Sequence, residues 1–394
     1  MALAVWFSMS AVVPSLRQEW GIDTTAAVWL TGTVQIGFVV GALGSTLLNL
    51  ADRFRPHRLL GTSAAAAAAC TLALAVAVEG MTGAIPLRFL TGVFLAGVYP
   101  VGMKLMASWA EPAGRAHALG LLVGALTLGS TLPQLIAGFG SPPWQLVLLV
   151  ASGLGFAGAA LAFGLVRPGP RLASSQEALQ PRYALRMLAQ RGPLLANLGY
   201  FGHMWELYAL WTWMPTFLLA SPAASNLPVT VGVLAFLTMG GAGALGCIIG
   251  GRAADRFGRS RTAVAVLTIS GLCCVASPWI TTAPAVAVII VCTIWGASVI
   301  ADSGIFSTAL SETADPRYVG TALTAQTAVG FALTVVSIQI VPIVAQAVGW
   351  RWAFLVLAVG PLVGATAMWL FGRVEQERRE ETAPHAVPRA GDEF

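Results

Sequence analysis

The sequence predicts an all-α integral membrane protein with twelve transmembrane helices in two pseudo-symmetric bundles of six. The first observation is composition: 57% hydrophobic and 10% charged residues, with a mean hydropathy of +0.77, cannot cover the water-facing surface of a 394-residue chain. The second is that apolar runs of about 20 residues, enough to cross a hydrocarbon core about 30 Å thick, recur from end to end. The third is that the tetrapeptide Ala-Asp-Arg-Phe occurs twice, at residues 51–54 and 254–257.

Twelve apolar runs are the expected spans. They cover residues 1–16, 27–50, 59–79, 84–108, 117–138, 144–165, 194–220, 228–250, 262–281, 284–310, 319–346 and 350–371. The first run rises only about 24 Å, which favours a natural start upstream of residue 1. A secretory signal peptide is the alternative, and the lack of a basic leader in residues 1–10 disfavours it.

Basic residues predict the orientation. Eighteen of the 22 lysines and arginines lie in the loops after even-numbered spans or in the tail. By the positive-inside rule these loops are cytosolic, so both chain ends are expected in the cytosol and the protein in a cytoplasmic (inner) membrane. This bias also accounts for a pI near 9.2 without a nucleic-acid partner.

The chain is expected to divide into four parts. Residues 1–166 form the N-terminal six-helix bundle and residues 194–371 the C-terminal one. Between them, residues 167–193 combine Pro, Ser, Gln and five Arg, which is typical of a cytosolic linker. Residues 372–394 are expected to be a disordered cytosolic tail. The protein is expected to act as a monomer.

The two Ala-Asp-Arg-Phe copies indicate a duplication. Each copy follows the second helix of its half, so the copies agree in position as well as in sequence. The stretch around the second copy supplies Gly251, Asp255, Arg256, Gly258, Arg259 and Arg261. The first copy keeps Asp52, Arg53 and Arg58, but Leu48 and Arg55 stand in place of the glycines.

These residues resemble the loop motif of the major facilitator superfamily, and Arg88 to Gly92 (RFLTG) resembles that family's fourth-helix motif. The resemblance implies a secondary transporter whose halves rock about a central path. It also implies a cytosolic gate, in which the motif aspartates pair with arginines and with a helix N-terminus. The alternative for the arginines is that they only anchor topology by charge.

Glu206 is the predicted proton site. It lies about 18 Å along the seventh span, near the midplane, where an ionisable group costs about 2.5 to 3.5 kcal/mol. Burial disfavours a charged carboxylate, so Glu206 could exchange a proton during transport. His203 shares its helical face. The alternative is a structural carboxylate satisfied by His203 or by a hydroxyl on another helix.

Several other polar residues in the spans are candidates for contact with the solute. Asp302, on the tenth span, is expected to contact substrate or a cation. Lys104 could snorkel to the cytosolic interface, or it could form an inner-gate pair or contact an anion. Arg88 is expected to take part in coupling or to anchor the outer interface. Three glutamines could hydrogen-bond a solute: Gln35, Gln134 and Gln326.

The predicted function is secondary active transport of a small polar solute, with an organic anion favoured by the mixed charges and a proton as the coupling ion. A proton-driven drug or metabolite exporter is the alternative, although Ser130 to Leu132 separate Gly129 from Pro133 where the exporter motif expects Gly-Pro. A membrane enzyme or a transport-dead sensor is disfavoured. Four histidines cannot build a multi-histidine metal site in the spans, and no phosphate-binding loop is visible, so neither metal nor cofactor is expected.

Overall fold

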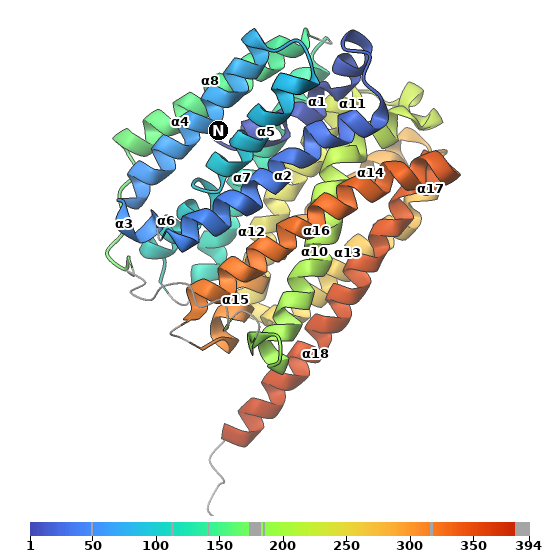
Figure 1. Cartoon of the computed structure of the whole chain (residues 1–394). Coiled ribbons are helices and arrows are strands. Elements are labelled where there is room, and N and C mark those ends of the chain that lie inside the picture. The colour runs from blue at the N-terminus through green and yellow to red at the C-terminus, as the bar shows by residue number, and fades with distance from the viewer. Residues whose placement is uncertain are drawn as a thin grey trace, which may run out of the picture.

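The computed structural model describes residues 1–48, 50–111, 114–140, 142–172, 183, 186–315 and 318–382. Within these ranges the regular secondary structure is helical and contains no strand (Figure 1). The predicted linker is described only at residues 167–172, 183 and 186–193, and residues 383–394 of the predicted tail lie outside the described residues.

The first half holds the six predicted spans. Its helices are α1 (Ala4–Glu19), α2 (Thr24–Leu47), α3 (Leu50–Arg53), α4 (Pro56–Ala77), α5 (Met81–Leu95), α6 (Tyr99–Trp109), α7 (Arg115–Gly138) and α8 (Trp144–Gly164). The short α3 carries the first Ala-Asp-Arg-Phe copy, and α5 and α6 together form the fourth span.

The second half repeats this pattern. Its elements are α10 (Arg191–Leu219), η2 (Pro222–Asn226), α11 (Val231–Ala235), the π-helix η3 (Phe236–Ala242), α12 (Gly243–Phe257), α13 (Arg259–Ile280), α14 (Ala285–Ile300), α15 (Ser303–Thr313), α16 (Val319–Val348), α17 (Trp350–Ala353), η5 (Phe354–Ala358) and α18 (Val359–Thr382). The second bundle therefore starts at Arg191 instead of residue 194, and α18 continues to Thr382, past the predicted end at 371.

Ten of these units are long enough and apolar enough to cross a membrane. The first span, α1, is short at 16 residues, as the sequence predicts. The seventh, α10, has 29 residues, but polar groups such as Asn197, His203 and Glu206 dilute its hydropathy. All three of these side chains are buried, so the helix carries its polar groups inward instead of toward lipid.

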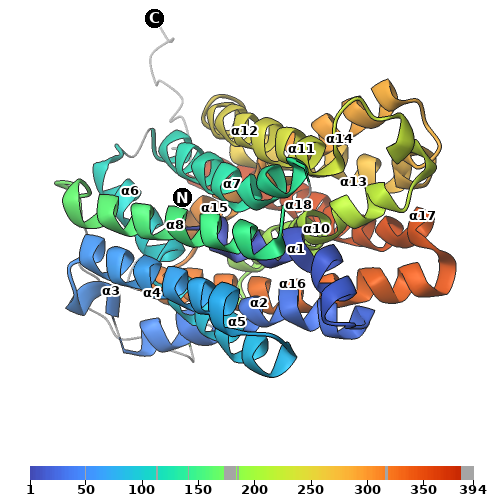
Figure 2. The same ribbon diagram turned by 90° about the horizontal axis from the view of Figure 1, so that it is seen from above.

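The two halves meet in two places (Figure 2). α7 packs against α11 and α12, and α2 packs against α16. Glycines allow the first contact, because a Cβ on Gly120 would lie 2.7 Å from the carbonyl oxygen of Cys247 and one on Gly124 would lie 3.1 Å from that of Ala244. Near the other end of α7, the Thr230 hydroxyl donates to the Gly138 carbonyl at 2.8 Å.

Two spans are broken at related places in the two halves. The fourth span breaks between α5 and α6 at residues 96–98, and the tenth breaks between α14 and α15 at Ala301 and Asp302. A break inside a membrane is tolerated only where it is buried in protein or lines a cavity. The breaks therefore mark the inner faces of the halves as the places to look for a site.

Close backbone packing between α2 and α5 yields a stability prediction. A Cβ on Gly37 would overlap the Phe89 carbonyl oxygen, so we expect Gly37→Val to cost about 1 to 3 kcal/mol of folding free energy. Gly44→Val, two turns further along α2, is the matched control, since a Cβ there meets no atom within 4 Å. Thermal unfolding of both proteins in detergent measures the difference. Equal midpoints would contradict the packing described here.

Candidate functional site

A cluster of six aromatic rings occupies the junction between the halves. It consists of Trp6 and Phe7 of α1, Phe38 of α2, Tyr208 and Trp211 of α10, and Phe331 of α16. The Phe38 and Phe331 rings, from opposite halves, have centroids 4.2 Å apart, and Trp6 lies 5.4 Å from Phe331 and 5.8 Å from Tyr208. We call these six residues the central aromatic cluster.

Buried polar atoms without hydrogen-bond partners lie in and beside this cluster. The indole N–H groups of Trp6 and Trp211 are two of them. Gln35, one helical turn before Phe38, has an unpartnered Oε1, and Gln326, earlier in α16 than Phe331, has an unpartnered Nε2. Because buried polar groups are normally paired, these atoms are available to a polar ligand or to water.

Arg88 is buried inside the first half instead of anchoring an interface. Its side chain is 1% exposed. Its guanidinium donates to the main-chain carbonyls of Val5 at 3.0 Å, Trp6 at 2.6 Å and Leu30 at 3.3 Å. Carbonyl dipoles solvate the cation but do not neutralise it. The Arg88 cation therefore contacts the main chain of Trp6, whose ring belongs to the central aromatic cluster.

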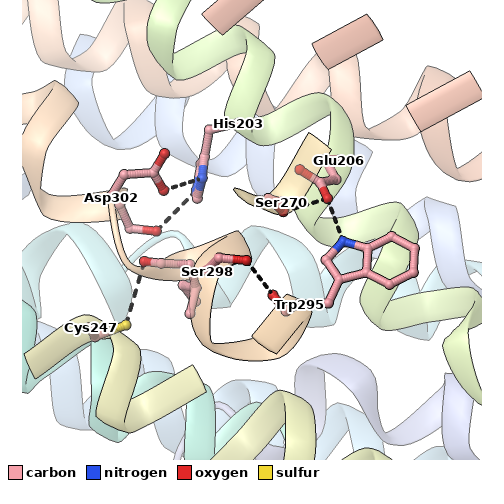
Figure 3. Close-up of polar contacts among 9 residues, drawn as sticks. His203, Glu206, Cys247, Ser270, Trp295, Ser298 and Asp302 are labelled. Carbon is pink, nitrogen blue, oxygen red and sulfur yellow. Dashed lines mark hydrogen bonds and ion pairs between the residues drawn. The ribbon is translucent and has the colours of Figure 1, made fainter. Parts of the chain in front are cut away.

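Glu206 is held by three donors inside the second half (Figure 3). Its Oε1 accepts from the Ser270 hydroxyl at 2.6 Å and the Trp295 indole at 2.6 Å, as Figure 3 shows. It also accepts from the Cys274 thiol at 3.1 Å. Ser270 and Cys274 are on α13 and Trp295 is on α14. This is the structural alternative considered for Glu206, with a hydroxyl from another helix as a partner. Its predicted role as the proton site stays a prediction.

His203 and Asp302 form a second buried polar group (Figure 3). His203 Nδ1 lies 2.8 Å from Asp302 Oδ1, and the two side chains are 2% and 1% exposed. The separation is that of an ion pair, and neither Asp302 oxygen has a hydrogen-bond donor among the described residues. His203 Nε2 is 3.0 Å from the Ser303 hydroxyl. Asp302 lies in the break of the tenth span, where its carbonyl accepts from the Ile305 amide.

The other solute candidates lie apart from these groups. Gln134 donates from Nε2 to the Ser10 hydroxyl at 3.3 Å, a contact between α7 and α1 within the first half. Lys104 is partly buried on α6, and both alternatives for it remain open. Trp6, Phe7 and the aromatics of α10 were not among the predicted site residues, because aromatic side chains in an apolar span are typical of packing as well as of binding. Trp205 and Trp213 do pack, since their indoles donate to the carbonyls of Val356 and Ile338.

The predicted gate residues lie around the two short loops. At the second loop Gly251 is buried and Gly258 has a φ of 92°, a conformation that favours glycine. Arg259 forms an ion pair with Glu312 of α15, which joins two elements of the same half, and its partial exposure makes it weak. The remaining arginines are exposed, as is Asp255: Arg53, Arg55, Arg58, Arg256 and Arg261. The side chain of Asp52 lies outside the described residues.

A cavity of about 230 Å³ lies between the halves at the end opposite these loops. Val13 and Arg17 of α1, Trp213 of α10, Gln346 of α16 and Trp350 of α17 contribute to its lining. Under the predicted orientation this is the outer end. At this end the halves leave space between α1, α10 and α16, while Thr230 still contacts Gly138 of α7.

Two six-helix halves that meet at a buried polar and aromatic junction define a multi-pass membrane transporter. Residues 1–338 match the family model described as "Major Facilitator Superfamily", and the chain belongs to this family. The predicted fold class and family are confirmed.

Similar transporters support the same class. The chain is 26% identical over 301 residues to a gallate transporter of Pseudomonas putida, covering 68% of this chain and 66% of that protein. It is 26% identical over 290 residues to the 4-hydroxybenzoate transporter PcaK of Pseudomonas aeruginosa, covering 64% and 62%. It is 23% identical over 403 residues to sodium-dependent phosphate transport protein 3 of Mus musculus, covering 91% and 80%. The chain thus spans just under two thirds of the two bacterial relatives.

The donors around Glu206 yield a stability prediction. Trp295→Phe keeps an aromatic ring but removes the indole N–H from a buried carboxyl group, which we expect to cost about 1 to 3 kcal/mol. Trp279→Phe is the control, because that side chain is 61% exposed. Thermal unfolding in detergent should show a lower midpoint only for Trp295→Phe. A similar midpoint for both variants would mean that this hydrogen bond does not stabilise the second half.

Proposed function

We propose that this protein transports a small aromatic carboxylate across the cytoplasmic membrane by alternating access, coupled to protons. The observation that carries the proposal is the central aromatic cluster, which joins the halves and includes two unpartnered indole N–H groups. A benzoate-like solute offers a ring face for stacking and carboxylate oxygens for these donors.

Charge favours an anion at this place. The Arg88 guanidinium donates hydrogen bonds to main-chain carbonyls, including that of Trp6. Carbonyls do not cancel its positive charge, so the charge favours an anion at the nearby junction. Gln326 adds an unpartnered amide donor from the second half. The printed names of two relatives, a gallate transporter and a 4-hydroxybenzoate transporter, agree with this substrate class.

The positions of the contacts support the proposal of alternating access. Glu206 and Arg88 are bonded within their own halves, which favours rigid bundles, whereas the junction consists of ring contacts and glycine packing. Rocking would open the cluster toward one side at a time. The gate residues around Asp255 would hold the halves together at the cytosolic end, and one chain would suffice for transport.

Transport by purified protein in proteoliposomes tests the function. With the lumen alkaline relative to the outside, we expect accumulation of 4-hydroxybenzoate and gallate, and less without the pH gradient. Inorganic phosphate under an inward sodium gradient is the comparison, because the mouse relative is named for that activity. Transport of phosphate alone, or of neither class of solute, would refute the proposal.

The role of the cluster is tested by removing one ring. Phe331→Leu keeps an apolar side chain at the junction but loses the stacking face, and we expect the KM for 4-hydroxybenzoate to rise about 2- to 10-fold. Phe354→Leu is the matched control, since that ring packs against Phe217 and Trp295 within the second half. Equal KM values in the two variants would place the substrate elsewhere.

A further inference from the structure

Glu206 and Asp302 are two buried acidic side chains that are candidates for the ion carrier, and their surroundings differ. All three hydrogen-bond donors of Glu206 belong to α13 and α14, in the same half as Glu206 itself. If the halves move as rigid bodies, these contacts do not change during the cycle. Within the part of the chain that the structure describes, neither oxygen of Asp302 has a hydrogen-bond donor, although the side chain is 1% exposed. A buried, unsatisfied carboxylate is costly, so it needs a positive partner.

The Asp302 turn lies at the boundary between the halves. A cavity of only about 10 Å³ lies between this turn and α7, and its lining includes Gly120 and Val123 of α7, Ala301 of the break and Gly304 of α15. That volume is at the lower limit for a single water molecule. In this state α7 therefore covers Ala301, next to Asp302, and withdrawal of α7 from the second half would open this side of the break to water.

Few titratable groups surround Asp302. His203 of α10 is its ion-pair partner, and the Cys247 thiol of α12 interacts with it electrostatically. Glu206 interacts electrostatically with His203. The α16 sequence has no titratable side chain. On α7, His117 is partly buried toward the predicted cytosolic end, and the Arg115 side chain lies outside the described residues.

We infer that the His203 and Asp302 pair, and not Glu206, carries the transported proton. This inference rests on the proposed function. With the proton on His203, an imidazolium faces the Asp302 carboxylate and the pair is neutral, which suits the state in which α7 covers Ala301. When α7 withdraws, water enters the break and takes the proton from the imidazolium. Water then hydrates the Asp302 carboxylate, which now faces a neutral His203 imidazole.

Ser303 suits both states of the pair. Its hydroxyl is 3.0 Å from His203 Nε2 and can accept a hydrogen bond from an N–H or donate one to a bare ring nitrogen. The N-terminus of α15, which starts at Ser303, also places a positive helix end beside Asp302. This helps to stabilise the carboxylate when the proton has left. Ser303 is therefore a positioning residue for the imidazole.

Transport assays separate the two acidic residues. In proteoliposomes, Asp302→Asn should lose accumulation of 4-hydroxybenzoate driven by a pH gradient but retain counterflow of the solute, which needs no net proton movement. His203→Gln should behave in the same way, and Asp302→Glu should restore part of the gradient response. Glu206→Gln should keep the gradient response. Loss of coupling in Glu206→Gln with normal coupling in Asp302→Asn would overturn the inference.

A second measurement needs no substrate. Nuclear magnetic resonance spectra are recorded on protein labelled at its 4 histidines. The signal that is missing from the spectrum of His203→Gln is assigned to His203. We expect this ring to titrate in the wild type and, in Asp302→Asn, to stay neutral at pH values where the wild-type ring is protonated. A His203 signal that does not change with pH would overturn the inference even if transport is proton-driven.

The two proposals fail in different ways. In one case neither aromatic acid is transported, even in counterflow, but the His203 signal changes with pH in the wild type and not in Asp302→Asn. The proposed substrate is then wrong, and the assignment of the proton site is supported. If a sodium gradient replaces the pH gradient in the wild type, and that response is lost in Asp302→Asn, the pair binds sodium and the proton assignment is wrong.

Discussion

The high cost of a charge in a medium of low dielectric constant governs this protein. Each buried ionisable side chain needs partners that the membrane cannot supply. Arg88 finds three carbonyls in the first half, and Glu206 finds three donors in the second. The partners named here all lie in the same half as the charge, so Arg88 and Glu206 tie helices together within each bundle and not between the bundles.

The junction between the bundles follows a different rule. Its contacts are stacked rings and glycines that admit a neighbouring backbone, and these interactions have little directional bonding to break. Polar atoms left unpaired there, such as the indole N–H groups of Trp6 and Trp211, would be a liability in a purely structural interface. Under the proposed function, a ligand that enters the junction would form hydrogen bonds with them.

The hydrogen-bond and ion-pair partners of His203 and Glu206 on α10 could not be predicted from the sequence. His203 and Glu206 lie three residues apart, and their shared helical face predicts that they act together. The structure directs them to different elements, because a separation of three residues leaves about 60° between side-chain directions. His203 points to α15, whereas Glu206 points to α13 and α14. The break at Ala301 and Asp302 contains neither proline nor glycine, so these residues do not predict an interruption of the helix.

The sequence by itself determined the spans, their grouping into two related halves and the presence of ionisable groups at membrane depth. These properties depend on the transfer of short segments from water to lipid and on a repeat that is visible in the letters. Only the tertiary structure decided which groups meet. Arg88 and Val5 are separated by 83 positions, and Glu206 and Ser270 by 64. Contacts over such distances depend on how helices pack, which no local segment encodes.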